Sequence, residues 1–521
     1  MPVTHPEERR WFASAPTSPP SPEGLRNPSH SPHGRPKARE TGAEANEDVE
    51  VGGPSTSIDA GEGWQPTRPS EGGPCWQELQ GGNMTVAKPM DSMSPEFLRV
   101  ADRAKRDPQG RILSLARLID VPALERAYGR LRKDAAVGVD GVTKEQYGQR
   151  LEQNLQGLYE RLRTKRYRHQ PIRRVNIPKE RGKTRPIGIS AFEDKLVQDA
   201  LREVLEVIYE PVFSDSSFGF RPKRGAHDAL RKLDHMLFER EVSWIIEADI
   251  QSFFDSIDRK MLKEMLRLRV ADESLLRLVG KCLHVGVLDG SEYSEPEVGT
   301  AQGSTLSPLL GNVYLHNVLD LWLEQEVRPR LRGRMKLVRY ADDFIIGFER
   351  EDDARRVMAV LGKRFERFGL KLHPDKTRLF PFARPRDRDP GGKGPTTFDF
   401  LGFTVYWRRS RWGGWALGLR TRKARMQRAI ASIDDWCRSH RHEPIGAQHA
   451  ALERKLVGHF NYFGVSGNGH SLQALSRAAQ RSWRKWLGRR SQRAAMTWKR
   501  FYEMLTSFPF PRPAVRVKLW A

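Results

Sequence analysis

The sequence predicts a mixed α+β protein that ends in a helical domain. Between about residues 95 and 405, stretches with helical periodicity alternate with short β-branched and aromatic runs. Long helices beside an antiparallel sheet are typical of the α+β class. From residue 404 on, apolar positions recur at helical spacing in three separate stretches. A chain of 521 residues has room for roughly three domains and a large core.

Residues 1–90 form a compositional unit of their own. They hold 14 of the 34 prolines, many Gly and Ser, and few apolar clusters. Such a segment cannot offset its ordering entropy by burial, so we expect a disordered tail. A regulatory or RNA-binding tail is the functional alternative. A natural start of translation at Met84 or Met90 is a third interpretation.

Residues 91–403 contain the predicted mixture of helices and strands. The expected elements, in chain order, are a helix over 151–162, a two-strand hairpin over 175–189, helices over 192–209 and 228–238, a buried strand over 244–250 and a helix over 260–268.

Residues 404–495 are predicted to be a helical domain, followed by a short basic tail over 496–521. Together the two segments carry 24 Lys or Arg against 5 Asp or Glu, and 8 of the 13 Trp. The apolar stripes are Met426/Ile430/Ile433/Trp436, Leu452/Leu456/Phe460/Phe463 and Leu472/Leu475/Ala479/Trp483/Trp486, with Gly488 as a helix stop. Core packing explains most of the Trp residues, but not the excess of cations. We expect a small bundle whose outer faces bind a phosphate backbone.

A pair of adjacent carboxylates, Asp342 and Asp343, follows a predicted strand that ends at Tyr340. The run from Phe344 to Phe348 is a second strand, which places the acids at a hairpin turn. Neighbouring carboxylates repel, and a divalent cation such as Mg²⁺ relieves that repulsion. An ordinary acidic hairpin tip is the alternative. A third carboxylate, Asp249, also follows a buried strand and argues against it.

Carboxylates from separate strands that converge on paired Mg²⁺ ions are what phosphoryl transfer requires. Because side chains alternate along a strand, Asp342 and Asp343 should point to opposite faces. We expect Asp342 to join Asp249 as a direct ligand of both metals. Asp343 should lie farther from the metals, behind their direct ligands or beside the primer end.

Composition agrees with a polyanionic partner. Basic residues exceed acidic ones by 24, and Cys75, Cys282 and Cys437 have no metal-ligand spacing. A ribosomal-type binding protein would share the charge but has no need for the carboxylates. The sequence has no membrane-spanning run and no signal peptide pattern, so we expect a cytoplasmic, nucleoid-associated protein without a membrane partner.

Seven ordered sequence blocks resemble bacterial group II intron-encoded reverse transcriptases and maturases, over roughly residue 91 to the C-terminus. Besides the acidic hairpin, they are Ala136-Val-Gly-Val-Asp-Gly-Val-Thr143, Ile177-Pro-Lys-Glu-Arg-Gly-Lys-Thr-Arg-Pro-Ile-Gly188, Asp215-Ser-Ser-Phe-Gly-Phe-Arg-Pro222, Gly299-Thr-Ala-Gln-Gly-Ser-Thr-Leu-Ser-Pro308, Leu372-His-Pro-Asp-Lys-Thr377 and Phe398-Asp-Phe-Leu-Gly-Phe403. Leu456-Val-Gly-His-Phe-Asn-Tyr-Phe-Gly464 fits the maturase motif. Ala301 replaces a usual Pro, and His373 a common Asn.

The resemblance implies a right-hand polymerase, with fingers and palm over 91–403 and a thumb or maturase domain over 404–495. It implies RNA-directed DNA synthesis with two Mg²⁺ ions, catalytic Asp249, Asp342 and Asp343, and a metal-binding set of Asp249, Ile250 and Asp342. We expect the type that lacks an endonuclease module, because no nuclease motif follows Phe510-Pro-Arg-Pro513.

The resemblance also assigns residues that contact nucleotides and nucleic acid. The incoming nucleotide would meet Lys179, Arg185, Gln302 and Phe254, with Phe254 stacking under the deoxyribose and Phe253 packing in the core. Template or primer contacts fall to Phe218, Arg221 and Lys376, although Phe218 could only pack. For RNA binding, charge and helix position suggest Arg481, Arg484 and Lys485.

The expected partners are the intron RNA, an RNA template, a DNA target or primer, and dNTPs, with a monomer or a homodimer left open. Diversity-generating or CRISPR-linked reverse transcriptases are one alternative, and the maturase-like helices argue against them. A splicing factor with a dead polymerase is another, and the intact carboxylates argue against that. A general basic RNA-binding protein would not explain the ordered blocks.

Overall fold

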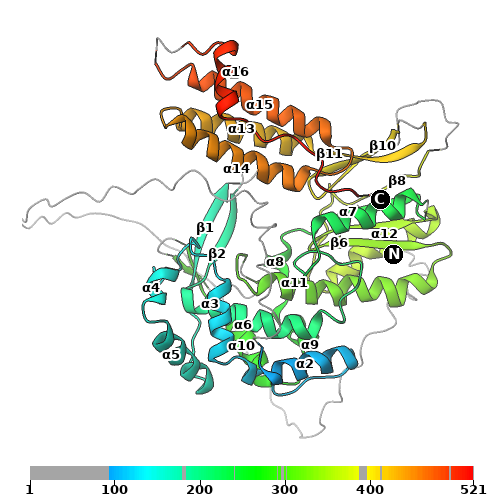
Figure 1. Ribbon diagram of the computed structural model, residues 1–521. Helices are drawn as coiled ribbons and strands as arrows, with labels where there is room; N and C mark the ends of the chain where they lie inside the picture. Colours follow the sequence, from blue (N-terminus) through cyan, green and yellow to red (C-terminus); the bar gives the residue numbers. More distant parts are fainter. Residues whose placement is uncertain are drawn as a thin grey trace, which may run out of the picture. The chain divides into compact units, whose positions relative to one another are not determined.

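The structure, a computed structural model, describes residues 93–178, 184–239, 241–289, 292–294, 298–300, 302–385, 396–410, 413–491 and 495–519 (Figure 1). The tail predicted over 1–90 lies outside these residues, as do Lys179 and Cys75. Internal contacts divide the chain between Gly81 and Gly82, and every described residue belongs to the second unit.

The first sheet has four strands in the order β2-β1-β4-β5. Its strands are β1 (Ile172–Pro178), β2 (Thr184–Ile189), β4 (Val287–Asp289) and β5 (Glu292–Ser294). The antiparallel β1–β2 pair is the predicted hairpin, whereas β1 runs parallel to β4. The helices of this region are α2 (Pro95–Arg106), η3 (Ala116–Leu118), α3 (Val121–Arg130), α4 (Lys144–Gly148), α5 (Leu151–Arg163), α6 (Phe192–Tyr209) and α10 (Glu273–Leu283). Both α2 and α3 pack on the largely buried α6.

The second sheet is antiparallel throughout, in the order β6-β7-β3-β8. Its strands are β3 (Trp244–Ala248), β6 (Met335–Tyr340), β7 (Asp343–Phe348) and β8 (Arg378–Pro381). Helix α12 (Glu351–Glu366) contacts β3, β7 and β8, and α7 (Ala226–Phe238) contacts β6. The short helices after β3 are α8 (Phe253–Ser256) and α9 (Arg259–Arg267). The central strands β3 and β7 are apolar along most of their length because both are enclosed by neighbouring elements.

A mostly buried helical segment leads from the first sheet region to β6. It consists of α11 (Ser307–Leu315), the π-helical η5 (His316–Asp320) and η6 (Trp322–Val327), and η7 (Arg328–Arg330). Short π-helical stretches are rare and are often associated with functional sites. Here the π-helical segment carries Asp320, whose side chain is fully buried.

The C-terminal region begins with a third sheet, not with a helix. The strands β9 (Phe398–Phe400), β10 (Phe403–Arg409) and β11 (Trp415–Thr421) form an antiparallel meander. The helical bundle therefore starts at Lys423, and not at residue 404 as the sequence predicts. The reason is that β10 and β11 pair with each other over seven residue pairs. The stability of a strand depends on its neighbouring strand, so the local sequence pattern of 404–421 does not reveal it.

The three predicted amphipathic helices are present as α13 (Lys423–Ser439), α14 (Ile445–Phe463) and α15 (Gly469–Leu487), which run side by side in Figure 1. Gly488 follows α15 as its C-cap, as expected. The predicted basic tail contains a further helix, α16 (Trp498–Ser507), which is anchored by the fully buried Phe501. Among the described residues, none of the helices has the length and apolar character needed to span a membrane.

Candidate active site

The acidic pair lies at the tight turn between β6 and β7. Tyr340 pairs with Asp343, so Ala341 and Asp342 form a two-residue loop. Ala341 has a φ of 56°, a left-handed conformation that a residue with a Cβ adopts only under constraint. Gly219 supplies part of the constraint, since a Cβ there would meet the Ala341 amide and lie 2.9 Å from the carbonyl carbon of Tyr340.

Asp249 directly follows β3, next to the segment over 371–376. The main-chain amide of His373 donates to the Asp249 carbonyl at 2.8 Å, and the amide of Gln251 to the Lys371 carbonyl at 2.8 Å. The Lys376 ammonium lies 2.6 Å from a carboxylate oxygen of Asp249. The Lys376 ammonium therefore lies beside Asp249, one of the carboxylates predicted to be catalytic.

The electrostatics of the turn show that three carboxylates are close together. Burial raises the pKa of Asp342, and the negative charge of Asp249 raises it further, against the opposing charges of Arg185 and Arg339. Burial raises the pKa of Asp343 to about 8, with added repulsion from Asp342 and Asp249. Groups that ionise with such difficulty gain most from a neighbouring cation.

Asp343 also has a distinct partner in the turn between β9 and β10. The Leu401 amide donates a hydrogen bond to the Asp343 carboxylate. Leu401 and Gly402 both have left-handed backbones, with φ values of 50° and 79°. The Tyr462 hydroxyl of α14 donates to the Leu401 carbonyl at 3.0 Å. These contacts connect the helical bundle to the acidic turn.

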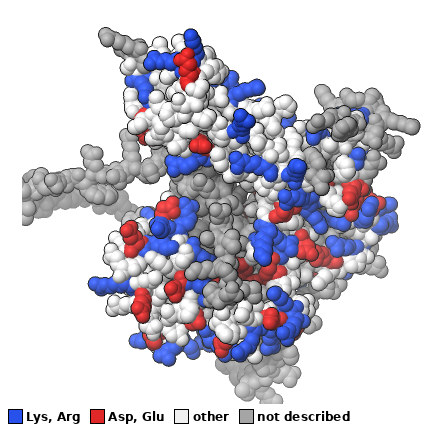
Figure 2. All heavy atoms as spheres, viewed as in Figure 1, with Lys and Arg blue, Asp and Glu red and all other residues white. Residues whose placement is uncertain are grey.

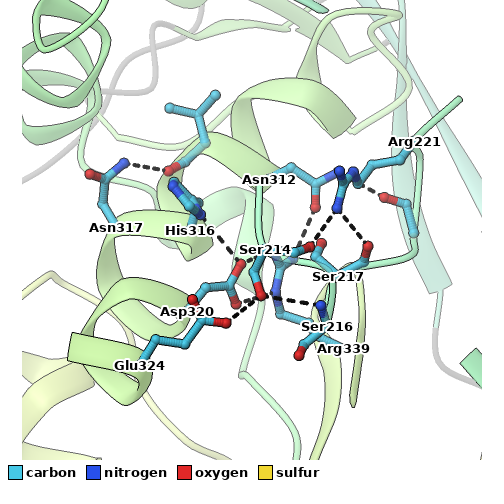
Figure 3. A network of polar contacts seen from close by, with 12 residues as sticks. Ser214, Ser216, Ser217, Arg221, Asn312, His316, Asn317, Asp320, Glu324 and Arg339 are labelled. Atoms are coloured by element: carbon cyan, nitrogen blue, oxygen red, sulfur yellow. Dashed lines mark hydrogen bonds and ion pairs between the residues drawn. The ribbon is translucent and has the colours of Figure 1, made fainter. Parts of the chain in front are cut away.

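A buried arginine network lies next to the acidic turn, and Figure 3 shows its polar contacts. Arg339, on β6, forms a two-pronged ion pair with Asp320, with N–O distances of 2.8 and 2.6 Å. Its remaining terminal nitrogen donates to the Asn312 side-chain oxygen at 2.9 Å and to the Ala341 carbonyl at 3.1 Å. Asn312 in turn donates to the Gly219 carbonyl at 2.7 Å. The network therefore holds both sides of the Gly219–Ala341 contact.

Neither member of this ion pair is accessible to solvent. The side chains of Arg339 and Asp320 are both 0% exposed. Burial acts to raise the pKa of Asp320, but the charge of Arg339 and the hydrogen bonds from His316 and Arg339 together lower the pKa below its ordinary value. The pair stays ionised inside the protein, where each charge depends on the other. The sequence reasoning did not identify Arg339, Asp320 or Asn312.

The predicted nucleotide-binding residues Arg185 and Gln302 meet opposite the acidic turn. The Arg185 guanidinium donates to the Gln302 side-chain oxygen at 2.7 Å, and the Gln302 amide donates to Asp255 at 3.2 Å. Gly303, at φ 110°, packs on the main chain of Gly188 in β2. A cavity of about 330 Å³ opens beside Gln302 and Asp255. Lys179, the fourth predicted contact, lies outside the described residues.

Phe253 and Phe254 occupy different environments, as expected. Phe253 is 3% exposed and belongs to the core, whereas Phe254 is half-buried. The Phe254 ring faces Gly311 of α11, where a Cβ would lie 3.2 Å from the ring. The Thr300 amide donates to the Phe254 carbonyl at 2.7 Å, which ties this residue to the loop that carries Gln302.

The two expected template residues lie inside the protein. Phe218 is 7% exposed and packs in the core, and Arg221 is 2% exposed. Arg221 donates to the Glu210 carboxylate at 2.8 Å and to the carbonyls of Ser214 and Ser217 at 2.6 and 2.8 Å. The structure therefore gives Arg221 a structural role in place of the predicted template contact. Its N–H groups already hydrogen-bond the loop that supports the acidic turn.

The residues present fit a divalent metal ion whose coordination is completed by substrate. Within the described ranges, no three His, Cys, Asp or Glu side chains gather as a complete metal cage. Magnesium is commonly held by one or two carboxylates together with substrate phosphates. Asp249 and Asp342 supply that pair. Ile250 is apolar and 4% exposed, so only its main-chain carbonyl is available as a ligand.

The predicted RNA-binding cations of α15 differ in their environments. Arg481 is exposed, and Lys485 is exposed but lies 3.2 Å from Asp434. Arg484 is half-buried, where it donates to the Met496 carbonyl at 2.8 Å and stacks on Trp498. Figure 2 shows Lys and Arg side chains spread over the visible face of the bundle. Arg481 and Lys485 are thus available to an external anion, and Arg484 is engaged within the domain.

Comparison with known proteins agrees with this geometry. Residues 177–405 match the family described as reverse transcriptase (RNA-dependent DNA polymerase). Protein YkfC of Escherichia coli is 33% identical over 353 residues, which cover 60% of this chain and 88% of that protein. The group II intron-encoded protein LtrA of Lactococcus lactis is 38% identical over 275 residues, or 50% of this chain and 45% of LtrA. The putative COX1/OXI3 intron 1 protein of Saccharomyces cerevisiae is 27% identical over 56% of this chain and 40% of its own length.

A carboxylate-bearing hairpin turn beside a third strand-end carboxylate defines a polymerase-type nucleotidyltransferase. The chain belongs to the reverse transcriptases, in the group II intron-encoded branch, and its activity is RNA-directed DNA polymerisation. Reverse transcriptase domains use divalent metal ions in this chemistry. The chain spans less than half the length of its intron-encoded relatives LtrA and the yeast intron 1 protein.

Proposed function

We propose that this reverse transcriptase binds the RNA of a group II intron, assists its splicing and supports its retrotransposition. Its other partners would be an RNA template, a DNA primer or target, and dNTPs. The observation that carries the proposal is the convergence of Asp249, Asp342 and Asp343 opposite Arg185 and Gln302, in a chain whose C-terminal bundle is strongly basic.

The layout we propose is that of a right hand. The first sheet and its helices correspond to fingers, the second sheet with α7 and α12 to the palm, and α13–α15 to a thumb that also serves as maturase domain. This assignment is supported by the position of the carboxylates on the second sheet and of Arg185 on the β1–β2 hairpin. The Tyr462–Leu401 hydrogen bond connects the proposed thumb to the β9–β10 turn, which in turn contacts Asp343 of the proposed palm.

In the proposed reaction the chain mainly positions charges. Two Mg²⁺ ions, when bound, would activate the primer 3′-hydroxyl and stabilise the oxygens of the leaving pyrophosphate. Asp249, Asp342 and the Ile250 carbonyl would hold them, while Asp343 stays bonded to Leu401. Arg185 would offset triphosphate charge, since it is half-buried and already directed at this site. Gln302 would hydrogen-bond the nucleotide sugar.

Phe254 is the residue we propose for sugar discrimination. Its ring is half-buried and held between Phe253 and Gly311, so it has little freedom to move aside. A 2′-hydroxyl would therefore meet a fixed aromatic surface beneath the sugar. Lys376, next to Asp249, would stay near the primer end or the leaving group.

The test combines primer extension on RNA with splicing of a precursor RNA built from the DNA that flanks this reading frame. Wild-type protein should extend the primer and accelerate splicing, whereas Asp342→Ala and Asp249→Ala should lose extension and keep RNA affinity. Asp352→Ala, an exposed carboxylate on α12, serves as the matched control. Splicing assistance without extension in wild type would favour a splicing factor without polymerase activity. Extension by both Asp variants would contradict the assignment of the catalytic carboxylates.

A further inference from the structure

An exposed aromatic stack lies on α16, outside everything described for the polymerase site. Trp498 is 39% exposed and Tyr502 is 55% exposed. Their spacing of one helical turn places them on the same face, and the rings stack with centroids 5.5 Å apart at an angle of 25°. Arg484 of α15 completes the stack, with its guanidinium 4.3 Å from the centre of the Trp498 ring. We call Arg484, Trp498 and Tyr502 the α16 stack.

The inner face of α16 is held by a residue outside this stack. Phe501, between the two exposed rings in sequence, is fully buried and lies 5.8 Å from the Trp483 ring in the bundle core. That packing fixes the helix from its inner side. Trp498 and Tyr502 instead keep neighbouring aromatic rings exposed to water, and a contiguous exposed apolar surface is a feature of many binding sites.

The surroundings of the stack are cationic. A cavity of about 480 Å³ adjoins it, lined by Arg484, Lys485, Arg489 and Thr497 among others. Lys485 and Arg489 lie 4.6 and 5.2 Å from the ring of Trp486. Arg484 joins the two features, because it lines the cavity and also stacks on Trp498. Aromatic faces next to guanidinium and ammonium groups match a nucleotide, which presents a flat base and an anionic phosphate together.

We propose that the α16 stack binds an unpaired base of single-stranded RNA, with a backbone phosphate of the same strand beside Lys485 and Arg489 in the adjoining cavity. The base would extend the stack on the outer face of Tyr502. This inference rests on the proposed function, which supplies an RNA partner. Base-paired RNA does not fit, because its bases are already stacked and only loops, bulges and ends offer a free aromatic face.

The charge of the C-terminal region, together with the aromatic rings of the α16 stack, favours a nucleic acid as the ligand. Residues 404–521 carry 24 basic and 5 acidic residues, so an acidic protein segment without aromatic rings would satisfy the charge but not the stack. Glu503 is the acidic residue within α16 itself, and it is exposed next to Tyr502. Because Glu503 repels a phosphate near Tyr502, a nucleic acid should place a base, and not a phosphate, against the Tyr502 ring.

The test uses three probes of about 12 nucleotides, a length within the usual site size: oligoadenylate RNA with one 2-aminopurine, the same sequence as DNA, and an RNA duplex. Stacking on Tyr502 should quench the 2-aminopurine fluorescence of the RNA strand. Tyr502→Ala should abolish the quenching and weaken single-strand RNA binding about 5-fold or more, the size expected when one base no longer stacks on an aromatic ring. Duplex binding should stay within about 2-fold.

Two variants control this experiment. Tyr502→Phe keeps the ring and should retain both the quenching and the affinity. Phe238→Ala removes another exposed aromatic residue, which stacks with Arg384 on a helix outside the bundle, and should leave RNA binding unchanged. Urea unfolding of Tyr502→Ala beside wild type shows whether any loss of binding reflects lost structure.

The slope of log affinity against log salt separates stacking from charge. It should not change in Tyr502→Ala, because this substitution removes no cation that could bind a phosphate.

If wild type binds the RNA strand and Tyr502→Ala binds it equally with full quenching, the α16 stack is not the site, and the proposed function stands. Tighter binding and stronger quenching with the DNA strand would overturn the assignment to RNA. Failure of wild type to bind any single strand would overturn both.

Discussion

The Arg339 guanidinium and the Asp320 carboxylate face each other with N–O distances of 2.8 and 2.6 Å, and both side chains are fully buried beneath the acidic turn. Arg339 lies two residues before Ala341 and bonds its carbonyl, whereas Asp320 comes from the π-helical segment η5. The ion pair thus connects a buried helical segment to the loop that carries Asp342. It gives a physical reason why a strained alanine can persist at this turn.

We predict that Arg339→Met lowers the free energy of unfolding by about 3–5 kcal/mol, because Asp320 is left as an unpaired buried charge. The double variant Arg339→Met/Asp320→Leu should recover most of the stability. It should not recover primer extension, since the Ala341 carbonyl and Asn312 still lack their donor. Urea unfolding and extension assays on the same preparations measure both effects.

The exposed pair Arg350–Asp352, 2.9 Å apart, is the matched control for this experiment. Arg350→Met should leave the free energy of unfolding almost unchanged, because exposed pairs are well solvated. If the double variant at Arg339 and Asp320 regains full extension together with stability, the pair only stabilises the fold and does not position the turn.

Phe254→Ala should admit ribonucleotides into the product. Removing the ring opens space for a 2′-hydroxyl, so the preference for dNTPs over rNTPs in kcat/KM should fall about 10-fold, as expected for about 1–3 kcal/mol of discrimination. Turnover of dNTPs should fall less. Phe253→Leu, which alters the neighbouring core ring, should leave the preference intact. An unchanged preference in Phe254→Ala would assign this residue to the core.

Arg481 and Lys485 should contribute to the salt dependence of RNA binding. Removing one cation that binds a phosphate should reduce the slope of log affinity against log salt by about 0.7 for single strands. Lys485 already pairs with Asp434, so Arg481→Gln should have the larger effect. Splicing assistance should weaken, whereas extension on a simple primed template should suffer less. Arg355→Gln, on α12, is a control that removes an exposed cation elsewhere.

Arg484→Gln should behave differently from its two neighbours. It removes the hydrogen bond to Met496 and the stacking on Trp498, so the free energy of unfolding should decrease along with RNA affinity. An unchanged salt slope in Arg481→Gln/Lys485→Gln, with splicing unaffected, would instead show that these cations only keep the bundle soluble.

His459 on α14 should make the protein sensitive to acid. Burial lowers the pKa of His459 to about 4, and its ring packs against Phe463 with centroids 4.5 Å apart. The unfolded chain therefore binds a proton at a higher pH than the folded protein. Above the unfolded pKa, His459 is neutral in both states and the folded protein keeps its full stability. The free energy of unfolding should fall as pH drops from about 6.5 to 4, by about 3 kcal/mol at most.

The measurement for His459 is urea unfolding across this pH range. His459→Gln should be less stable than wild type at neutral pH but should lose less stability on acidification. Wild type and variant that respond to pH in parallel would show that His459 is not the group responsible.

The candidate catalytic carboxylates could be predicted from the sequence because their signals are local. Asp249, Asp342 and Asp343 each stand at the end of an apolar run, a position where packing does not explain an acid, and the structure places Asp249 close enough to Asp342 to raise the pKa of the Asp342 carboxyl. The helices α6, α13, α14 and α15 also follow from local periodicity. The predicted start of the bundle at residue 404 is wrong, because β10 and β11 stabilise each other through pairing that no local window contains.

The sequence by itself thus determined the class of chemistry, the carboxylates and the basic character of the bundle, since these depend on residue type and short-range pattern. Only the tertiary structure decided that Arg339 and Asp320 form one unit, that Arg221 is used internally, and that Arg484 is stacked on Trp498 while Arg481 faces solvent. Charged side chains look alike along a sequence. Whether a charge is buried and paired, or exposed and available to a ligand, depends on groups from distant segments that only folding brings within a few ångströms.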